Sequence, residues 1–295
     1  MKKNLLLAFI ACALISCGMG KKVNPQVSTV AKQNATLTHT GGANNQEVFE
    51  PSQKNIKNKT QVDSLATFKA EALTPKWRHA KEGFNHDAFD SLLLAYVSKT
   101  GIVNYKGLLE NKKLLDAYIG SLNNTTPTDT WTKQDKLAYW MNAYNAMTLD
   151  LILRNYPINS IKDLKKPWDQ RLWKLGEKWY SLNEIEHQIL RKMDEPRIHF
   201  GINCASFSCP PLLNEAFNAA AVSMQLEKAA IQFINDPKRN TISKMNIEVS
   251  QIFSWFSKDF KKEGTLFEFL NQYAAVQIDP KAKKKYKKYN WSLNE

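Results

Sequence analysis

A change in composition near residue 62 most constrains what this chain can fold into. Residues 18–61 are rich in Asn, Gln, Thr, Ser, Lys and Gly and poor in large apolar side chains. Such a segment cannot bury enough surface to offset its ordering entropy, so we expect a disordered tether. Aromatic residues then continue to Trp291. The remaining stretch of about 230 residues has the size of one domain, which we assign to 63–295.

Residues 1–16 have the pattern of a lipoprotein signal peptide. Two lysines precede an apolar run over 5–15, which is too short to span a bilayer. Two aliphatic residues, a serine and Cys17 follow and resemble the bacterial lipobox, which implies cleavage before Cys17 and lipidation of its thiol. We therefore expect 17–62 to be a lipidated cysteine and tether. The protein would be anchored in the cell envelope, at the outer membrane or the periplasmic face. A generic signal peptide cut elsewhere is the alternative.

The positive charge is concentrated in few places. The formal net charge is +13, and six lysines lie within 281–288. No nucleic-acid recognition motif accompanies them, and an exported lipoprotein rarely meets nucleic acid, so we expect no such partner. We interpret the lysines as a solvated face, with attraction to anionic lipid or another envelope polyanion as the alternative. No apolar run reaches the roughly 18–20 residues of a membrane span, which excludes a multi-spanning protein.

Helix-like and short strand-like segments alternate through the domain, which predicts an α+β fold: one helix-rich domain with a short-stranded sheet. Capping boxes at Thr132-x-x-Asp135 and Ser181-x-x-Glu184 mark the starts of two helices, ending near Asn155 and Lys192. Further helices are expected over 86–98, 108–122, 214–235 and 252–260. Strands are expected over 101–105 and 198–202, and a hairpin over 172–175 and 178–180 with its turn at Gly176.

Two asparagines lie on the first of these capped helices. Asn142 and Asn145 are three residues apart, so they share one face of a helix that is apolar on nearly every side. Buried amides must be hydrogen-bonded. We interpret them as holding neighbouring loops, and the alternative is that one orients a catalytic group or donates to a substrate carbonyl.

The second capped helix carries Glu184 and His187 on its polar face. A solvated face with pairing along the helix is one interpretation. The other makes His187 a base or an orienting group, because the nearby helix N-terminus disfavours its protonated form. Glu184 is then a second catalytic candidate.

The stretch 197–211 is the most unusual in the chain. His199 lies on the expected strand, and Cys204 and Cys209 follow on a loop of small residues closed by two prolines. In an oxidising compartment these two cysteines form a disulfide by default. The alternative is a reactive thiol, stabilised by His199 or His187. A strict strand would point His199 and Cys204 to opposite faces unless a turn follows Asn203.

These histidines and cysteines fit no familiar metal-ligand spacing, so we expect no metal and no other cofactor. The aromatic residues of this half of the chain could line a glycan or peptide groove, although such residues are more often core. They are Trp168, Trp173, Trp179, Trp255 and Phe256.

Four separated motifs resemble the family catalogued as domain of unknown function 547, which occurs in exported bacterial proteins and in larger plant proteins. The motifs are Trp140-Met-Asn-Ala-Tyr-Asn-Ala146, Ser181-Leu-Asn-Glu-Ile-Glu-His187, Pro196–Pro210 with its His and two Cys, and Trp291-Ser-Leu-Asn294. The resemblance spans about 84–294 and assigns no role to any residue. The motif residues that carry over are Asn142, Asn145, Glu184, His187, His199, Asn203, Cys204, Ser206, Ser208 and Cys209.

Three functions follow from these residues. In the first, a thiol-dependent hydrolase or acyltransferase acts on an amide or ester: Cys204 attacks, His199 or His187 takes the proton, and Asn142 or a loop amide stabilises the oxyanion. In the second, a non-catalytic module with a Cys204–Cys209 disulfide binds envelope glycan, peptide or a protein partner. The third is a thiol–disulfide oxidoreductase. We favour the first, with Asn145, Asn203, Ser206 and Ser208 as binding residues.

Overall fold

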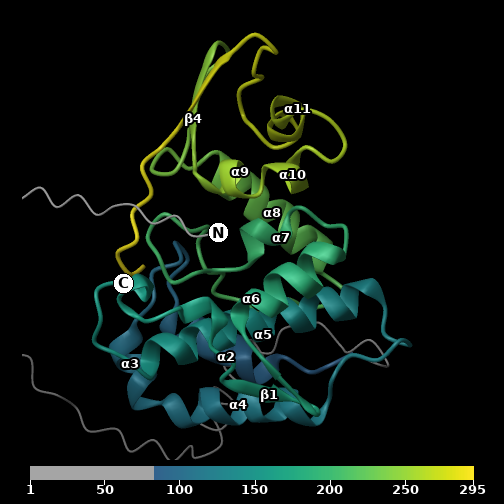
Figure 1. Cartoon of the computed structure of the whole chain (residues 1–295), viewed down its shortest axis with the longest axis vertical. Coiled ribbons are helices and arrows are strands. Elements are labelled where there is room, and N and C mark those ends of the chain that lie inside the picture. Colours follow the sequence, from purple (N-terminus) through teal and green to yellow (C-terminus); the bar gives the residue numbers. More distant parts are fainter. Residues whose placement is uncertain (1–82) are drawn as a thin grey trace, which may run out of the picture. The chain divides into compact units, whose positions relative to one another are not determined.

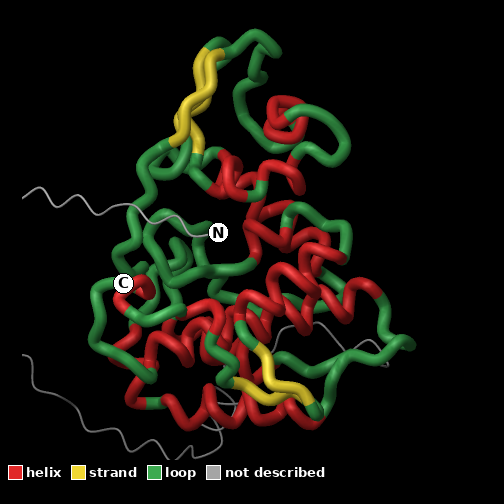
Figure 2. The backbone as a smooth tube through the Cα atoms, in the orientation of Figure 1, coloured by secondary structure: helices red, strands yellow, loops and turns green. Residues whose placement is uncertain are grey.

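The structure is a computed structural model that describes residues 83–295. The expected signal peptide, the lipidated Cys17 and the tether lie outside the described residues. Helices dominate and the sheets are small (Figures 1 and 2), which confirms the α+β class. No helix between residues 83 and 295 combines the length and apolarity that crossing a bilayer requires.

The first half of the described chain packs around one long helix, α5 (Lys133–Leu153). The Thr132 hydroxyl accepts from the Asp135 backbone N–H, and the Asp135 carboxylate accepts from the Thr132 backbone N–H, so the expected capping box is present. Almost every residue from Asp135 onward is buried, as an all-round apolar helix requires. The helices around it are α2 (Asp87–Tyr96), α3 (Tyr105–Glu110) and α4 (Lys112–Asn124).

A hairpin closes this half of the fold. Its strands β1 (Trp173–Leu175) and β2 (Lys178–Tyr180) pair antiparallel, and Gly176 supplies the positive φ of the turn. This confirms the expected hairpin. Two short 3₁₀ turns, η1 (Ile161–Asp163) and η2 (Pro167–Asp169), precede it.

The C-terminal half contains a three-stranded sheet that the sequence analysis did not predict. Strand β4 (Asn246–Val249) lies in the middle, antiparallel to β3 (Thr241–Ile242) and parallel to β5 (Lys283–Tyr286). The lysines of β5 are exposed along this edge strand, and such lysines discourage pairing with another chain. The helices of this half are α8 (Val222–Ile234), α9 (Ile252–Trp255), α10 (Ser257–Phe260) and α11 (Leu266–Asn271).

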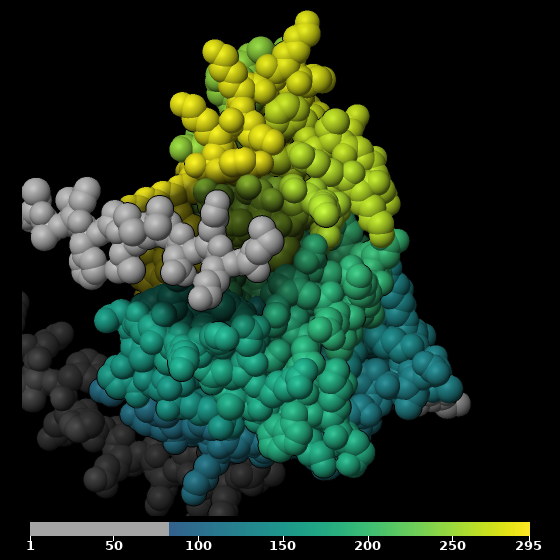
Figure 3. All heavy atoms as spheres, viewed as in Figure 1, coloured from purple at the N-terminus to yellow at the C-terminus, as the bar shows by residue number. Residues whose placement is uncertain are grey.

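Two hydrophobic clusters correspond to these halves. The first gathers around α5 and the second around the phenylalanines of α8 to α11. In the space-filling view of Figure 3, residues after about 240, coloured lime to yellow, occupy one end of the described part and teal residues the other. The final segment, residues 287–295, runs from one end to the other, because the Asn294 carbonyl accepts a hydrogen bond from the Val103 backbone N–H near α3.

The expected strand over 198–202 is wrong, because the chain forms the short helix α7 (Ile198–Gly201) there. All four of its residues are buried, so alternation of side-chain type does not reflect alternation of faces. Helix α7 joins the clusters: Ile198 packs into the first and Phe200 into the second. Gly201 lets the end of α7 pack closely on the first cluster, since a Cβ there would meet the Phe217 ring at 2.9 Å.

Other expected elements are shorter or broken. Residues 101–105 contribute only an isolated bridge, between Val97 and Val103. The expected helix over 108–122 is interrupted at Asn111, and the one over 214–235 begins at Val222. The helix after Ser181 is regular only over α6 (Leu182–Glu184). It continues as a π-helical turn, η3 (Ile185–Ile189), and a 3₁₀ turn, η4 (Leu190–Lys192).

Candidate functional site

A cavity of about 340 Å³ lies where the two hydrophobic clusters meet. Tyr144 of α5 and Ile202 after α7 bring the first cluster to its wall, and Ile252 of α9 brings the second. The cavity collects four of the side chains that the sequence analysis singled out: His187, His199, Cys204 and Cys209.

Cys204 and Cys209 face each other on the loop after α7. Both are free thiols, and their sulfurs lie 2.7 Å apart. Although burial opposes ionisation, a hydrogen bond from Cys209 and hydroxyl groups nearby lower the pKa of Cys204 to about 7. The hydroxyls are those of Ser206, 2.9 Å from the Cys204 sulfur, and Tyr289, 3.4 Å away. Burial and the neighbouring Cys204 raise the pKa of Cys209, so Cys204 is the member of the pair that ionises more easily.

A tight turn holds Cys204 in this position. Ala205 adopts a left-handed conformation with φ 58°, which residues with a Cβ rarely do. Asn203 supports it: its Oδ1 accepts from the Ala205 N–H at 2.7 Å, and its Nδ2 donates to the Pro210 carbonyl at 2.8 Å. The backbone N–H of Ser206 is thereby turned toward the Cys204 sulfur and favours its thiolate. Such conformations persist where the surrounding structure imposes them, and often at functional sites.

His199 is paired with Asp259 of α10. Its Nε2 lies 2.8 Å from the Asp259 carboxylate, which also accepts two hydrogen bonds from Arg191. Although burial opposes it, these bonds lower the pKa of Asp259, so the carboxylate is ionised and Nε2 carries the ring proton. Within residues 83–295 no group donates a hydrogen bond to Nδ1 of His199. The lone pair of this nitrogen can therefore accept a proton. The ring stacks on Phe256 with a centroid distance of 4.0 Å.

His187 belongs to the same network. Its Nδ1 lies 2.9 Å from a guanidinium nitrogen of Arg191, and because arginine only donates, Nδ1 must accept. Burial and then the Arg191 charge lower the pKa of His187. The ring is therefore neutral near pH 7, with its proton on Nε2.

The π-helical turn η3 places Glu186 inside the protein. Its side chain is buried, and one carboxylate oxygen accepts from the Tyr144 hydroxyl at 3.2 Å. Burial raises the pKa of Glu186 to about 7. In a regular helix Glu186 would not share the buried face of Ile185 and Ile189. A π-helical turn contains one more residue than an α-helical turn, so the residues are spaced differently around the helix axis. Such turns often mark functional sites, and here one adds a carboxyl group to the cavity.

Tryptophan and tyrosine rings form one wall of the cavity, from three separate segments. Trp168 comes from η2, Trp255 from α9, and Tyr289 and Trp291 from the final segment. Trp255 lies 4.8 Å from Tyr289 and 5.7 Å from Trp291, between ring centroids, and is 48% exposed. Of the other tryptophans considered above, Trp173 is buried in the core and Trp179 is exposed outside this cavity.

Two of the expected catalytic residues do not reach the cavity. Asn142 is fully buried, and its amide accepts from and donates to the backbone of Phe217, at 2.9 and 2.8 Å. It therefore holds a loop and has no free group for an oxyanion. Glu184 binds Arg171 through both carboxylate oxygens and caps its own helix at Ser181.

The expected binding residues mainly support the cysteine loop. Asn145 donates to the Gly201 carbonyl and accepts from the Asn203 N–H, so it fixes the exit of α7. The Ser208 hydroxyl accepts from the backbone N–H of Asn290 at 2.9 Å and attaches the loop to the final segment. Ser206 alone of this group contacts a sulfur, that of Cys204.

Four residues of the site were not predicted as functional from the sequence: Glu186, Asp259, Arg191 and Tyr289. Glu186 stands inside the second motif, one residue before His187, but its helical position suggested no role. Asp259 follows His199 by 60 positions and belongs to no motif. The sequence predicted a short aromatic helix over 252–260 but no role for its Asp259, so three-dimensional packing was needed to find the pair.

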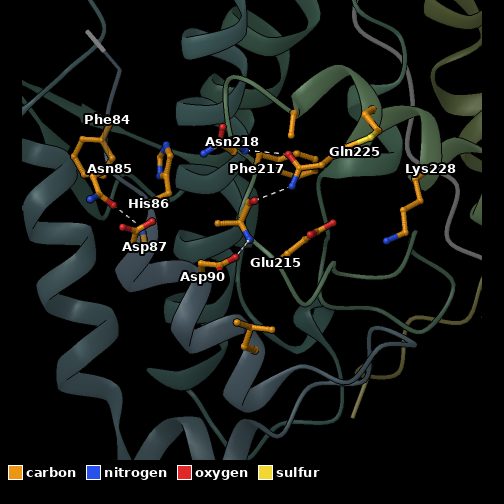
Figure 4. A pocket seen from close by; sticks show the side chains of 14 residues that line it. Phe84, Asn85, His86, Asp87, Asp90, Glu215, Phe217, Asn218, Gln225 and Lys228 are labelled. Carbon is orange, nitrogen blue, oxygen red and sulfur yellow. Dashed lines mark hydrogen bonds between the residues drawn. The ribbon is translucent and has the colours of Figure 1, made fainter. Parts of the chain in front are cut away.

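A second cavity, of about 390 Å³, lies beside α2 and the start of α8 (Figure 4). Its polar groups bind one another: Asp90 accepts from the Ala216 N–H, and Gln225 donates to the Ala216 carbonyl. His86 faces Tyr118, with 2.7 Å between Nδ1 and the hydroxyl. The described residues that line it include no cysteine or hydroxyl nucleophile. We therefore place the candidate site in the first cavity.

Residues 83–295 contain no group of three or more His, Cys, Asp or Glu side chains placed to hold a metal ion. Neither a curated protein nor a solved structure matches the chain.

One family model matches, over residues 128–234. This range includes the first three motifs and, with them, both cysteines and both histidines of the cavity, while Asp259 and the final tryptophan motif lie beyond it. Residues 128–234 thus match the family described as protein of unknown function, DUF547, which confirms the resemblance that the motifs indicate.

Proposed function

We propose that this protein is a thiol-dependent acyl-transfer enzyme of the bacterial envelope, acting on an amide or ester. The observation that supports this most is that two groups line one cavity: the Cys204 sulfur, with its pKa lowered to about 7, and the His199 ring paired with Asp259. A thiol that ionises easily, beside an oriented neutral imidazole that can take its proton and pass it on, supplies the parts that nucleophilic acyl transfer needs. The envelope location rests on the lipobox before Cys17.

In the proposed reaction the Cys204 sulfur attacks the substrate carbonyl carbon. The C–S bond forms, the bond to the leaving nitrogen or oxygen breaks, and the thiol proton passes through His199 Nδ1 to the leaving group. Water, or another acceptor, then attacks the thioester and releases Cys204. The Tyr289 hydroxyl, 3.4 Å from the sulfur, is placed to donate to the developing oxyanion, the role expected of Asn142.

No hydrogen bond between His199 and Cys204 is recorded in the described part of the chain. Catalytic hydrogen bonds are often long before substrate binds and tighten in the complex. Before substrate binds, Cys209 and Ser206 hold the Cys204 sulfur, and the bound substrate must draw the sulfur toward Nδ1 of His199.

Thiol–disulfide exchange is a second candidate, favoured by the 2.7 Å contact between Cys204 and Cys209. Cys204 would attack a substrate disulfide to form a mixed disulfide, and Cys209 would resolve it. The products are a Cys204–Cys209 disulfide and two substrate thiols. The more exposed thiol with the lower pKa would attack and the buried one would resolve.

Three variants of the full-length chain separate these functions. Activity is measured on a panel of p-nitrophenyl esters and aminocoumarin amides and, separately, on a small dithiol-reducible disulfide. Cys204→Ala is expected to abolish acyl transfer, Cys209→Ser to retain it, and Ser91→Ala, at an exposed position of α2 away from the cavity, to behave as wild type. Acyl transfer that survives Cys204→Ala would overturn the proposal. Disulfide reduction lost in Cys209→Ser, without any acyl transfer in wild type, would establish the second candidate.

A further inference from the structure

The lining of the candidate cavity differs in charge from the rest of the protein. The chain has 41 lysines and arginines against 28 acidic residues. None of the described residues that line this cavity is a lysine or arginine, while two, Asp169 and Glu186, carry carboxyl groups. Arg191 is near, but its guanidinium is bound to Asp259 by two hydrogen bonds. The cavity therefore disfavours an anionic ligand.

Glu186 offers an unused acceptor in the cavity. Its side chain is only 8% exposed, and a single hydrogen bond, from Tyr144 to Oε2, is recorded for it among residues 83–295. The second oxygen, Oε1, accepts no hydrogen bond from the described residues and is not one of their fully buried polar atoms without a partner, so it is open to the cavity. A ligand that donates hydrogen bonds would satisfy it.

The aromatic wall attracts the same kind of ligand. Trp255, Tyr289 and Trp291 pack with centroid distances of 4.5 to 5.7 Å and belong to one wall. Faces of such rings attract cations, tryptophan most strongly. Trp291 already contacts one ammonium group of the protein, since the Lys162 Nζ lies 5.1 Å from its ring centroid.

We propose that this cavity binds a primary ammonium group, the kind carried by a lysine side chain or an alkylamine. The Glu186 carboxylate would accept its hydrogen bonds, and the rings of Trp255 and Trp291 would contact its charge and its methylene chain. Asp169 adds a second negative charge at the cavity wall. Three features of the described residues together assign this site: no lysine or arginine lines the cavity, Glu186 Oε1 accepts no hydrogen bond, and aromatic rings form one wall.

The role of the amine rests on the proposed acyl-transfer function. The amine is then the group that leaves from an amide substrate or accepts the acyl group from the Cys204 thioester. In the accepting direction the ammonium gives one proton to the Glu186 carboxylate. Its nitrogen attacks the carbonyl carbon, the C–N bond forms and the C–S bond breaks. The second proton goes to the Cys204 thiolate, which restores the thiol. Binding of the amine itself does not depend on this chemistry.

The test compares three ligands of one length on the full-length chain: butylammonium, 1-butanol and butyrate. Tryptophan fluorescence and calorimetric titration give the dissociation constants at pH 7.5. Butylammonium is expected to bind about tenfold or more tightly than 1-butanol, with butyrate weakest. Comparable affinities for butylammonium and 1-butanol would overturn the proposal, and this comparison needs no variant that must fold.

Matched variants locate the site. Glu186→Gln and Trp255→Leu are each expected to weaken butylammonium binding about fivefold or more, whereas Glu177→Gln and Trp179→Leu, which alter exposed residues of the hairpin, leave it unchanged. Equal losses in both pairs would contradict this assignment. Cys204→Ser separates the two proposals: it should retain butylammonium binding while losing acyl transfer. Retained acyl transfer in this variant would remove the proposed function and leave the ammonium site standing.

Discussion

Asp259 accepts a hydrogen bond from His199 at 2.8 Å, across 60 positions of sequence and between two short helices. This contact decides which nitrogen of the ring can act as a base. Since the ionised carboxylate holds the Nε2 proton, Nδ1 is the nitrogen with a free lone pair. Arg191 binds the same carboxylate and thereby fixes its orientation.

Replacing Asp259 by Asn tests that relationship. The amide would present either a donor or an uncharged acceptor to Nε2, so the productive tautomer of His199 would lose its stabilisation. We expect kcat/KM for acyl transfer to fall about 10²- to 10⁴-fold, with little change in KM. Steady-state kinetics on the best substrate of the ester and amide panel measures this. Asp163→Asn, on an exposed 3₁₀ turn, is the control, and an equal loss there would contradict the role of Asp259.

The reactivity of Cys204 is expected to depend on Cys209. The rate of iodoacetamide labelling should rise with a midpoint near pH 7 in the wild type, because the pKa of Cys204 is lowered to about 7. Cys209→Ala removes the donor that contributes most to this, so the midpoint should move toward the ordinary cysteine value of about 8.5. Site-resolved mass spectrometry of the full-length chain follows the Cys204 peptide alone.

The same experiment decides the redox state. A wild-type Cys204 that resists labelling until a reductant is added would show that the Cys204–Cys209 disulfide forms in the isolated protein. A labelling midpoint near 8.5 in both proteins would contradict the stabilised thiolate.

Asn142 is expected to matter for stability. Asn142→Ala would leave the buried N–H and carbonyl of Phe217 without partners, and each such loss costs about 1–3 kcal/mol. We expect the free energy of unfolding to fall by about 2–4 kcal/mol in urea titrations. The matched control is Asn155→Ala, which removes one hydrogen bond near the exposed end of α5 and should cost about 1 kcal/mol or less. Equal effects would contradict the structural role of Asn142.

Short sequence patterns predicted those elements that form from neighbouring residues alone. The capping box at Thr132 and the unbroken apolar character after it indicated α5, and Gly176 between two short alternating runs indicated the hairpin. The error at 198–202 has a physical cause: Ile198–Gly201 are all buried, so the pattern that distinguishes a strand from a helix is absent. In the sheet of β3, β4 and β5, strand β4 pairs with β5 between residues 37 positions apart, such as Asn246 and Lys283, which no local pattern reports.

The candidate site was predictable only in part for similar reasons. His199 and the two cysteines stand out because their loop is chemically unusual over a few residues. Glu186 was missed because a π-turn changes the spacing on which helical faces are assigned. Asp259 and the aromatic wall come from segments far from the motifs, and only packing of the second hydrophobic cluster brings them to the first.

The last prediction concerns acid stability and a histidine outside the candidate site. Burial lowers the pKa of His86 to about 3, against an ordinary value of 6.5 when the chain is unfolded. Between these values the unfolded chain binds a proton that the folded protein does not, so stability rises with pH and falls as the pH drops below about 6.5. From pH 7 to pH 5 this amounts to about 2 kcal/mol for a shift of this size. His187 and His199, whose pKa values are also lowered by burial, add to the same trend.

Urea titrations of wild type and His86→Gln at pH 5, 6 and 7 isolate the contribution of His86. The variant should lose stability overall, because Tyr118 loses its imidazole partner, but its stability should change less with pH than that of the wild type. An unchanged slope would show that His86 titrates in the folded protein as it does in the unfolded chain.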